Sequence, residues 1–407
     1  MNNTKQISRF TLEAAMLSLV FLFTPIISYA SCKNDSISVH CGKTPTSVFD
    51  EKGTLWIAFA QQGHVYVSHS DDLGKHYTTP IKVNPNPQKI YTNGENRPKI
   101  QIANHHVFVS WTEKTPGRFT GDIHFSRSIN GGISFEPVKT INDDGLPIGH
   151  RFDAMTVTPS GTIYIAWLDK RDSHAAKQRN QEYAGISIYY AISTDQGKTF
   201  SNNIKIAEHT CECCRIAITS TGVDNATVMW RHIFTGGYRD HAIATLNQEK
   251  PTALHRATVD QWKTDACPHH GPSIDMTPHN SIHLAWFSNG DLHKGIYYGN
   301  YSTSLKSTNN IISIDHSPHA SHSQVVEFHN IVWFVWKSFE KGQSVLKVRY
   351  SLDKGVHWSN ADIIASTQAN SDHPLLIHDH NNIYISWQTT NEGLRLIPLY
   401  VDSENTN

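Results

Sequence analysis

The chain has 407 residues, with 35 Lys+Arg against 36 Asp+Glu and a formal net charge of −1 at pH 7. Such a balanced chain has no overall field that would recruit nucleic acid or an anionic membrane surface, so neither is expected as a partner. Glycine, β-branched residues and aromatics are plentiful and long Leu/Ala-rich periods are missing, which predicts strands and turns. The 26 histidines are the outlier, and they are either ordinary polar surface or, in part, metal ligands and proton carriers.

Residues 1–30 have the pattern of a secretory signal peptide. Lys5 and Arg9 supply the positive start, an apolar run covers 16–23, and Ser28 and Ala30 are the small residues before the predicted cleavage site. The apolar run is too short for a transmembrane helix, and no later segment is apolar enough to span a membrane. We therefore expect an exported protein, periplasmic or secreted, in which disulfides are permitted. Lipid attachment at Cys32 is the alternative.

An apolar triplet that ends in an aromatic residue recurs through the rest of the chain. The seven copies are WIAF (56–59), FVSW (108–111), YIAW (164–167), TVMW (227–230), HLAW (283–286), WFVW (333–336) and YISW (384–387). The last aromatic residue of each copy follows the previous one after 50 to 63 residues. An extended stretch precedes each copy, a turn separates the two, and another β-branched or aromatic strand follows. Three or four short strands per repeat of this length predict the blades of a β-propeller.

Four repeats share a turn of the form Ser-x-Asp/Asn-x-Gly-x-x-aromatic after their third strand. These turns are SDDLGKHY (70–77), SINGGISF (128–135), STDQGKTF (193–200) and SLDKGVHW (351–358). The Asp or Asn can cap the turn's amides, Gly takes the positive φ, and the aromatic packs between strands. Here the chain resembles the Asp-box, or bacterial neuraminidase repeat, proteins of the sialidase-like β-propeller superfamily. The resemblance covers nearly the whole mature chain and implies a single all-β propeller domain over 31–407.

The number of blades is the first open choice. Sialidases have six blades, whereas this chain has seven aromatic strands and seven leading strands, so we expect seven. The last repeat stops after its third strand, at 394–401. The segment SISVH at 36–40 is expected to supply the missing outer strand and to close the ring.

The leading ends of the innermost strands should meet at one mouth of the channel, opposite the Asp-box turns. They carry Asn96, Arg97, His150, Arg151, Asp153, His209, Cys211, Cys213, Cys214, Arg215, Cys267, His269, His270, His316, His319, His322, Asp372 and His373. Thiolates and imidazoles together are ligands for copper or zinc. The leading hypothesis is therefore a transition-metal site, copper before zinc, with Cys211, Cys213, Cys214, Cys267, His269 and His270 as ligands. His319, His322 or His373 are further candidates, and Asp153 and Arg97 would orient ligands or substrate.

Disulfide bonding is the competing interpretation of the cysteines. Six cysteines are an even number in an exported chain. A bridge from Cys32 to Cys41 would hold the amino-terminal segment in place. One or two bridges among the other four cysteines, for example from the 211–214 run to Cys267, would remove thiolates from the metal site.

The resemblance to sialidases implies a second function, glycoside hydrolysis. Sialidases hold a substrate carboxylate with three arginines, use a Tyr paired with Glu as nucleophile and use an Asp as acid/base. Arg97, Arg151 and Arg215 are the candidate arginines, and Asp153 is the candidate acid. Three features depart from the family: KTPTSV replaces the Arg-Ile-Pro motif before the first Asp-box, the arginines come from three consecutive repeats, and no tyrosine stands at a late leading end. A third interpretation is a propeller without catalysis that binds a glycan or a protein at the same mouth.

Overall fold

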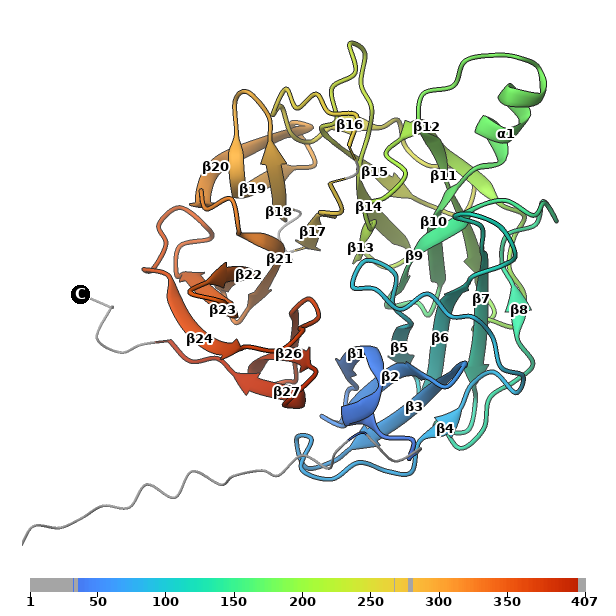
Figure 1. Ribbon diagram of the computed structural model, residues 1–407, viewed down its shortest axis with the longest axis vertical. Coiled ribbons are helices and arrows are strands. Elements are labelled where there is room, and N and C mark those ends of the chain that lie inside the picture. Colours follow the sequence, from blue (N-terminus) through green and yellow to red (C-terminus); the bar gives the residue numbers. More distant parts are fainter. Residues whose placement is uncertain (1–31, 33–35, 267, 277–280, 402–407) are drawn as a thin grey trace, which may run out of the picture.

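The structure is a computed structural model that describes residue 32 and residues 36–266, 268–276 and 281–401. The predicted signal peptide and Cys267 lie outside these residues. Seven antiparallel sheets surround a central channel, so the protein is a single seven-bladed β-propeller, as the repeat predicts (Figure 1). The choice of seven blades over six is confirmed.

Each sheet begins with an inner strand that lines the channel and continues outward in chain order. The inner strands are β1 (Lys43–Phe49), β5 (Lys99–Ala103), β9 (His150–Val157), β13 (Ala217–Thr221), β17 (Ser273–Met276), β21 (Ser321–Phe328) and β25 (Leu375–His378). The second strands are β2 (Leu55–Gln61), β6 (His106–Glu113), β10 (Ile163–Asp169), β14 (Asn225–Arg231), β18 (Ser281–Asn289), β22 (Ile331–Glu340) and β26 (Ile383–Thr389).

The two outer positions of each sheet are more variable in length. The third strands are β3 (His64–Ser70), β7 (Asp122–Ser128), β11 (Ile186–Ser193), β15 (His241–Leu246), β19 (Lys294–Ser302), β23 (Gln343–Ser351) and β27 (Gly393–Pro398). The fourth strands are β4 (Ile81–Lys82), β8 (Lys139–Thr140), β12 (Ile204–Thr210), β16 (His255–Arg256), β20 (Ser307–Asp315) and β24 (Asp362–Thr367).

The prediction that residues 36–40 form the outer strand of the last blade is wrong. This segment ends in a short 3-10 helix, η1 (Val39–Cys41), and the last blade has only three strands, β25 to β27. Side-chain amides bind its backbone in place of a strand partner: Gln61 Nε2 donates to the carbonyl of Ser36 at 3.1 Å, and Gln388 Nε2 donates to the carbonyl of His40 at 2.9 Å. Because Gln61 belongs to the first blade and Gln388 to the last, these bonds join the two blades at the seam of the ring.

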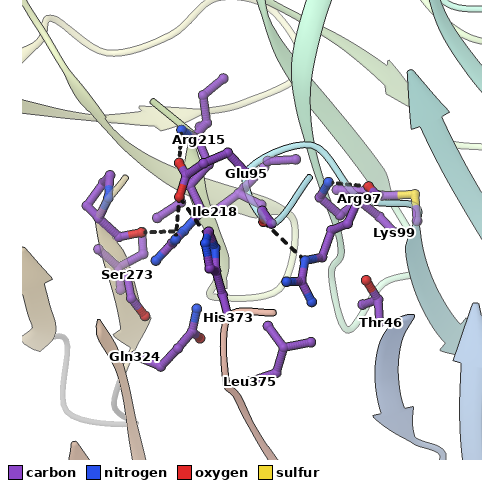
Figure 2. Close-up of a pocket in the computed structure, with 17 residues that line it drawn as sticks. Thr46, Glu95, Arg97, Lys99, Arg215, Ile218, Ser273, Gln324, His373 and Leu375 are labelled. Carbon is purple, nitrogen blue, oxygen red and sulfur yellow. Dashed lines mark hydrogen bonds and ion pairs between the residues drawn. The ribbon is translucent and has the colours of Figure 1, made fainter. Parts of the chain in front are cut away.

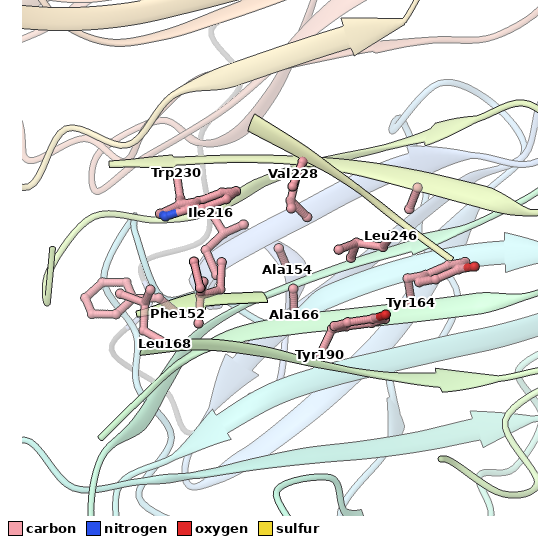
Figure 3. Close-up of a cluster of buried hydrophobic side chains, with 14 of the residues drawn as sticks. Phe152, Ala154, Tyr164, Ala166, Leu168, Tyr190, Ile216, Val228, Trp230 and Leu246 are labelled. Atoms are coloured by element: carbon pink, nitrogen blue, oxygen red, sulfur yellow. The ribbon is translucent and has the colours of Figure 1, made fainter. Parts of the chain in front are cut away.

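The repeating aromatic residues form the core between the blades. All seven, from Phe59 on β2 to Trp387 on β26, are at most 1% exposed. Figure 3 shows one such core, in which Trp230 and Val228 of the fourth blade pack toward Tyr164 and Ala166 of the third. Burial of apolar surface between neighbouring sheets is the main stabilising contribution to the ring.

The four Ser-x-Asp/Asn turns have the geometry that their sequence predicts. In each turn the glycine amide donates to the serine hydroxyl at 2.8 or 2.9 Å. The Asp or Asn carboxyl or amide oxygen accepts from the amide two residues after the glycine, at 2.8 to 3.1 Å. The glycines have φ between 79° and 90°, and the final aromatic of each turn packs against a buried cluster.

Two further features concern the ends and the mouth of the ring. The expected disulfide between Cys32 and Cys41 is present, with the two Cα atoms 5.6 Å apart. The polar insertion between β10 and β11 forms a helix, α1 (Arg171–Gln178), that the sequence analysis did not predict.

Among the described residues no helix has the length and apolar character needed to cross a bilayer.

Candidate functional site

A cavity of about 230 Å³ lies in the channel where the leading ends of the inner strands meet. Figure 2 shows that its polar lining comes from several blades, with Arg97 and Lys99 opposite Ser273 and Gln324, and with Glu95 beside His373. Apolar side chains of the inner strands, among them Ile216, Ile274 and Leu375, complete the wall. Residues far apart in the chain therefore converge on one opening. This agrees with the prediction that the leading ends of the innermost strands meet at one mouth of the channel.

The charged groups of this cavity are paired with one another. Glu95 accepts from the Arg215 guanidinium at 2.9 Å and from the Arg215 amide at 2.7 Å. Arg97 donates to Asp372 at 2.9 Å, and to the carbonyls of Gly94 and Pro45. These side chains are at most 13% exposed. Because every guanidinium already has a carboxylate partner, the cavity carries fixed opposite charges with little excess of either sign.

The other two residues proposed for hydrolysis do not line the cavity. Asp153 has a fully buried carboxylate that accepts hydrogen bonds from Ser110 Oγ at 2.7 Å and Thr112 Oγ1 at 2.9 Å. The guanidinium of Arg151 lies over the ring of Phe119, 5.2 Å from its centroid. Only Arg97 and Arg215 of the four proposed residues reach the cavity, so the structure does not bring the three arginines together.

Three of the predicted metal ligands form a compact cluster next to this mouth. The sulfurs of Cys211, Cys213 and Cys214 all lie within 4.8 Å of one another, and those of Cys211 and Cys213 are 3.8 Å apart. The three residues are at most 4% exposed, and none of them is in a disulfide. The run crosses from β12 to β13, so its turn places all three sulfurs on one side of the connection. The disulfide interpretation is not realised within this trio.

Two arginines, Arg231 and Arg239, bring positive charge near the three sulfurs. Arg239 Nη1 donates to Cys211 Sγ at 3.4 Å, and the Arg231 guanidinium also acts on this cluster. Hydrogen bonds from Cys213 and Cys214, assisted by both arginines, lower the pKa of the Cys211 thiol. Hydrogen bonding to Cys211 raises the pKa of Cys213.

The remaining predicted ligands divide between two places. Cys267 lies outside the described residues. Among the side chains that the structure describes, the group of ligand atoms around the three sulfurs includes no nitrogen of His269 or His270. His270 instead stacks on Phe287, with ring centroids 4.2 Å apart, and lies 4.9 Å from the ring of His322. Among the described residues of the proposed set, the structure brings together Cys211, Cys213 and Cys214 and leaves His269 and His270 apart from them.

Glu95, His322 and His373 form a second cluster of ligating side chains, at the edge of the cavity. One carboxylate oxygen and one nitrogen from each ring lie within 4.8 Å of one another. The two imidazoles are stacked, with centroids 3.4 Å apart. Burial lowers the pKa of both histidines well below the usual value, so both rings are neutral near pH 7.

A third group of ligating side chains, Asp144, His150 and Asp169, lies between the second and third blades. His150 is completely buried, and its Nε2 is 3.1 Å from Asp144 Oδ2. Its Nδ1 donates to the carbonyl of Gly121 at 2.9 Å. Because both ring nitrogens already have protein partners, this group is a structural ion-pair network.

No family model and no curated protein matches this chain. Among solved structures, it is similar to an ulvan lyase of polysaccharide lyase family PL25, with a TM-score of 0.56 and 10% identity over 88% of this chain and 94% of the other. It is also similar to the polysaccharide lyase Uly1, with a TM-score of 0.51 and 10% identity over 96% of each chain. At this identity the likeness shows the propeller fold and nothing finer.

Glu95, Lys99 and Arg239 were not among the predicted site residues. Glu95 and Lys99 stand at the leading end of the second blade, beside Arg97, so the placement rule would have found them. Arg239 lies in a β14–β15 loop, and its contact with Cys211 depends on the fold of that loop. No pattern in the sequence signals that contact.

Proposed function

We propose that the protein binds a soft transition-metal ion, copper(I) before zinc, through Cys211, Cys213 and Cys214 at the channel mouth. The observation that carries the proposal is the spacing of the three sulfurs. Metal–thiolate bonds of about 2.3 Å separate the sulfurs of a trigonal or tetrahedral site by about 3.8–4.0 Å. The distance of 3.8 Å between Cys211 and Cys213 fits that value without rearrangement.

The charges near the cluster favour copper(I) over zinc. Three thiolates and one copper(I) leave two negative charges, and the guanidiniums of Arg231 and Arg239 offset both. Zinc(II) would leave an excess of positive charge in a buried place, unless a further anionic ligand joined it. Cys267 remains a proposed fourth ligand, whereas the position of His270 beside Phe287 favours a separate role for that residue.

Metal analysis tests this proposal directly. Purified mature protein is loaded anaerobically with copper(I), and bound copper is counted for the wild type and for Cys213→Ser. We expect one tightly bound copper that the substitution removes. Arg239→Met should weaken copper(I) binding about ten- to a hundredfold, because a hydrogen bond to a charged group is worth roughly 1.5–3 kcal/mol. A wild-type protein that binds no copper or zinc, with three titratable thiols, would end the proposal.

A second candidate function is recognition or cleavage of a glycan in the central cavity. The observation that favours it is a cavity lined by Arg97, Lys99 and Arg215 in a fold shared with polysaccharide lyases. One of these structures is described as bound to -[GlcA(1-4)Rha3S]-, an acidic sugar sequence. An acidic glycan would bind by competing for the guanidinium of Arg97 or Arg215, which now pairs with a protein carboxylate.

Binding and turnover assays separate the forms of this candidate. Uronate-containing and sulfated polysaccharides and a fluorogenic sialoside are offered to the wild type and to Arg97→Gln, with thermal melts as the folding control. Loss of binding in Arg97→Gln alone supports the cavity as the site. Turnover of the sialoside would identify the protein as an exo-sialidase. If neither the polysaccharides nor the sialoside bind, the glycan candidate is rejected.

We further propose that the chain is an exported member of the Asp-box, sialidase-like propellers. The four turns with the same hydrogen bonds support the family, and the Cys32–Cys41 disulfide agrees with an oxidising compartment. Mass spectrometry of the mature amino terminus, with cleavage expected after Ala30, tests the export step.

A further inference from the structure

Four side chains from four different blades meet at the edge of the central cavity. Glu95 precedes β5, His270 precedes β17, His322 lies in β21 and His373 precedes β25. Glu95 Oε1 is 3.8 Å from His322 Nε2 and 3.7 Å from His373 Nδ1. Both distances exceed a hydrogen bond, so these groups are gathered without being bonded to one another.

One ring nitrogen of each histidine in this cluster, Nδ1, has no hydrogen-bond partner among the described residues. In the part of the chain that the structure describes, Nδ1 of His270, His322 and His373 is shielded from solvent and has no hydrogen-bond partner. Buried polar atoms are almost always satisfied, so three unpartnered nitrogens on neighbouring rings require an explanation. A metal ion bound about 2.0–2.1 Å from a ligating nitrogen would satisfy such atoms.

His322 faces Glu95 with Nε2, which also lies near a backbone carbonyl, so Nδ1 is the nitrogen that it would offer to a metal. Its Nε2 lies 3.2 Å from the carbonyl oxygen of His269. A carbonyl can only accept, so Nε2 carries the hydrogen and Nδ1 carries the free lone pair. A ligating histidine typically donates its other ring N–H to such a carbonyl, which fixes the tautomer and the direction of the ring.

Glu95 can contribute an oxygen without losing Arg215. An ionised carboxylate has about four lone-pair sites, and Arg215 occupies one on each oxygen. The other cations near the cluster are held by protein groups: Arg97 by Asp372, and Lys337 by the carbonyl of Ser371 at 2.9 Å. Their positive charge favours an anion or hydroxide on the side of a bound metal that faces the cavity.

We propose that Glu95, His322 and His373 form a second metal site, distinct from the cysteine cluster, that binds a divalent ion of the zinc class. Imidazoles are borderline ligands and a carboxylate is a hard one, and this combination suits zinc(II). The site has no thiolate, the soft ligand that favours copper(I). Glu95 and His373 also line the cavity, so the ion would have an open coordination position toward it. A site with three protein ligands and one open position is the arrangement of catalytic rather than structural zinc. His270 flanks the site and is available as a further ligand.

Cobalt(II) and zinc(II) titrations of the chelator-treated mature protein test the site separately from the cysteines. Cobalt bound to thiolates gives intense sulfur-to-metal charge-transfer bands, whereas nitrogen and oxygen ligands give only weak d–d bands. The variants are Cys213→Ser with Cys214→Ser, His373→Ala and His322→Gln. His319→Ala, an exposed histidine of the neighbouring loop, is the matched control.

We expect the double cysteine variant to retain one equivalent of cobalt or zinc without charge-transfer bands. His373→Ala and His322→Gln should each remove one equivalent from the wild type and leave those bands in place, while His319→Ala changes nothing. Zinc and cobalt binding that is equal in wild type, His373→Ala and His322→Gln would overturn the inference. If the double cysteine variant does not fold, the two histidine variants in the wild-type background still decide. Failure of the copper proposal would show independently, as a wild-type protein without charge-transfer bands.

Discussion

The buried His150 network predicts a specific pH dependence of stability. Burial lowers the pKa of His150, but hydrogen bonds to Asp122 and Asp144 and the charge of Asp169 outweigh it and raise the pKa to about 10. A raised pKa in the folded state stabilises the protein fully below the unfolded pKa of 6.5. This stability is lost as the pH rises from there through about 10.

The magnitude follows from the same difference. One pKa unit corresponds to 1.36 kcal/mol, so the rise from 6.5 to about 10 corresponds to at most about 5 kcal/mol of unfolding free energy. His150 is completely buried and two of its three carboxylate partners are at most 10% exposed, so solvent screening removes little of it. In His150→Gln the residue cannot be charged, and this part of the pH dependence disappears.

Urea unfolding of the wild type and His150→Gln at a series of pH values measures the effect. Other groups also titrate in this range, so the difference between the two proteins is the quantity to follow. We expect His150→Gln to be less stable by several kcal/mol near pH 6 and to approach the wild type near pH 10. A constant difference across the whole range would refute the assignment of a charged His150.

Three further substitutions probe the fold. Trp230→Ala should cost about 3–5 kcal/mol of unfolding free energy, because it leaves a cavity between two blades. Val223→Ala, at a side chain that is 66% exposed, should stay within about 0.5 kcal/mol. Equal effects of the two substitutions in chemical denaturation would contradict the assigned core. Gly355→Ala should destabilise by more than about 1 kcal/mol, because φ is 90° and the added carbon would collide with the hydroxyl of Tyr298; an unchanged melting temperature would argue against this turn geometry. Ser193→Ala removes the hydroxyl that caps the Gly197 amide and should cost about 1 kcal/mol, and urea midpoints that do not move would show that water replaces it.

The sequence by itself determined the architecture of the ring. Seven apolar triplets ending in an aromatic residue, and four turns with Ser, Asp or Asn, and Gly at fixed offsets, act through local rules of burial and turn formation. Those rules need only neighbouring residues, so blade number, inner strands and turn hydrogen bonds were all predictable. The closeness of Cys211, Cys213 and Cys214 was predictable for a similar reason, since the three residues lie next to one another in the connection between β12 and β13.

The tertiary structure alone decided how distant groups pair. The prediction of a closing strand at 36–40 failed because side chains bind the backbone of this segment in place of a strand. These side chains are Gln61 on the first blade and Gln388 on the last. The placement rule brought Arg151 to the correct mouth, but packing against Phe119 directs it away from the cavity. His270 and His322 meet from separate blades, and only the closed ring sets the angle and depth of each loop. Such contacts depend on the orientation of one blade relative to the next, and no local pattern of residues encodes that orientation.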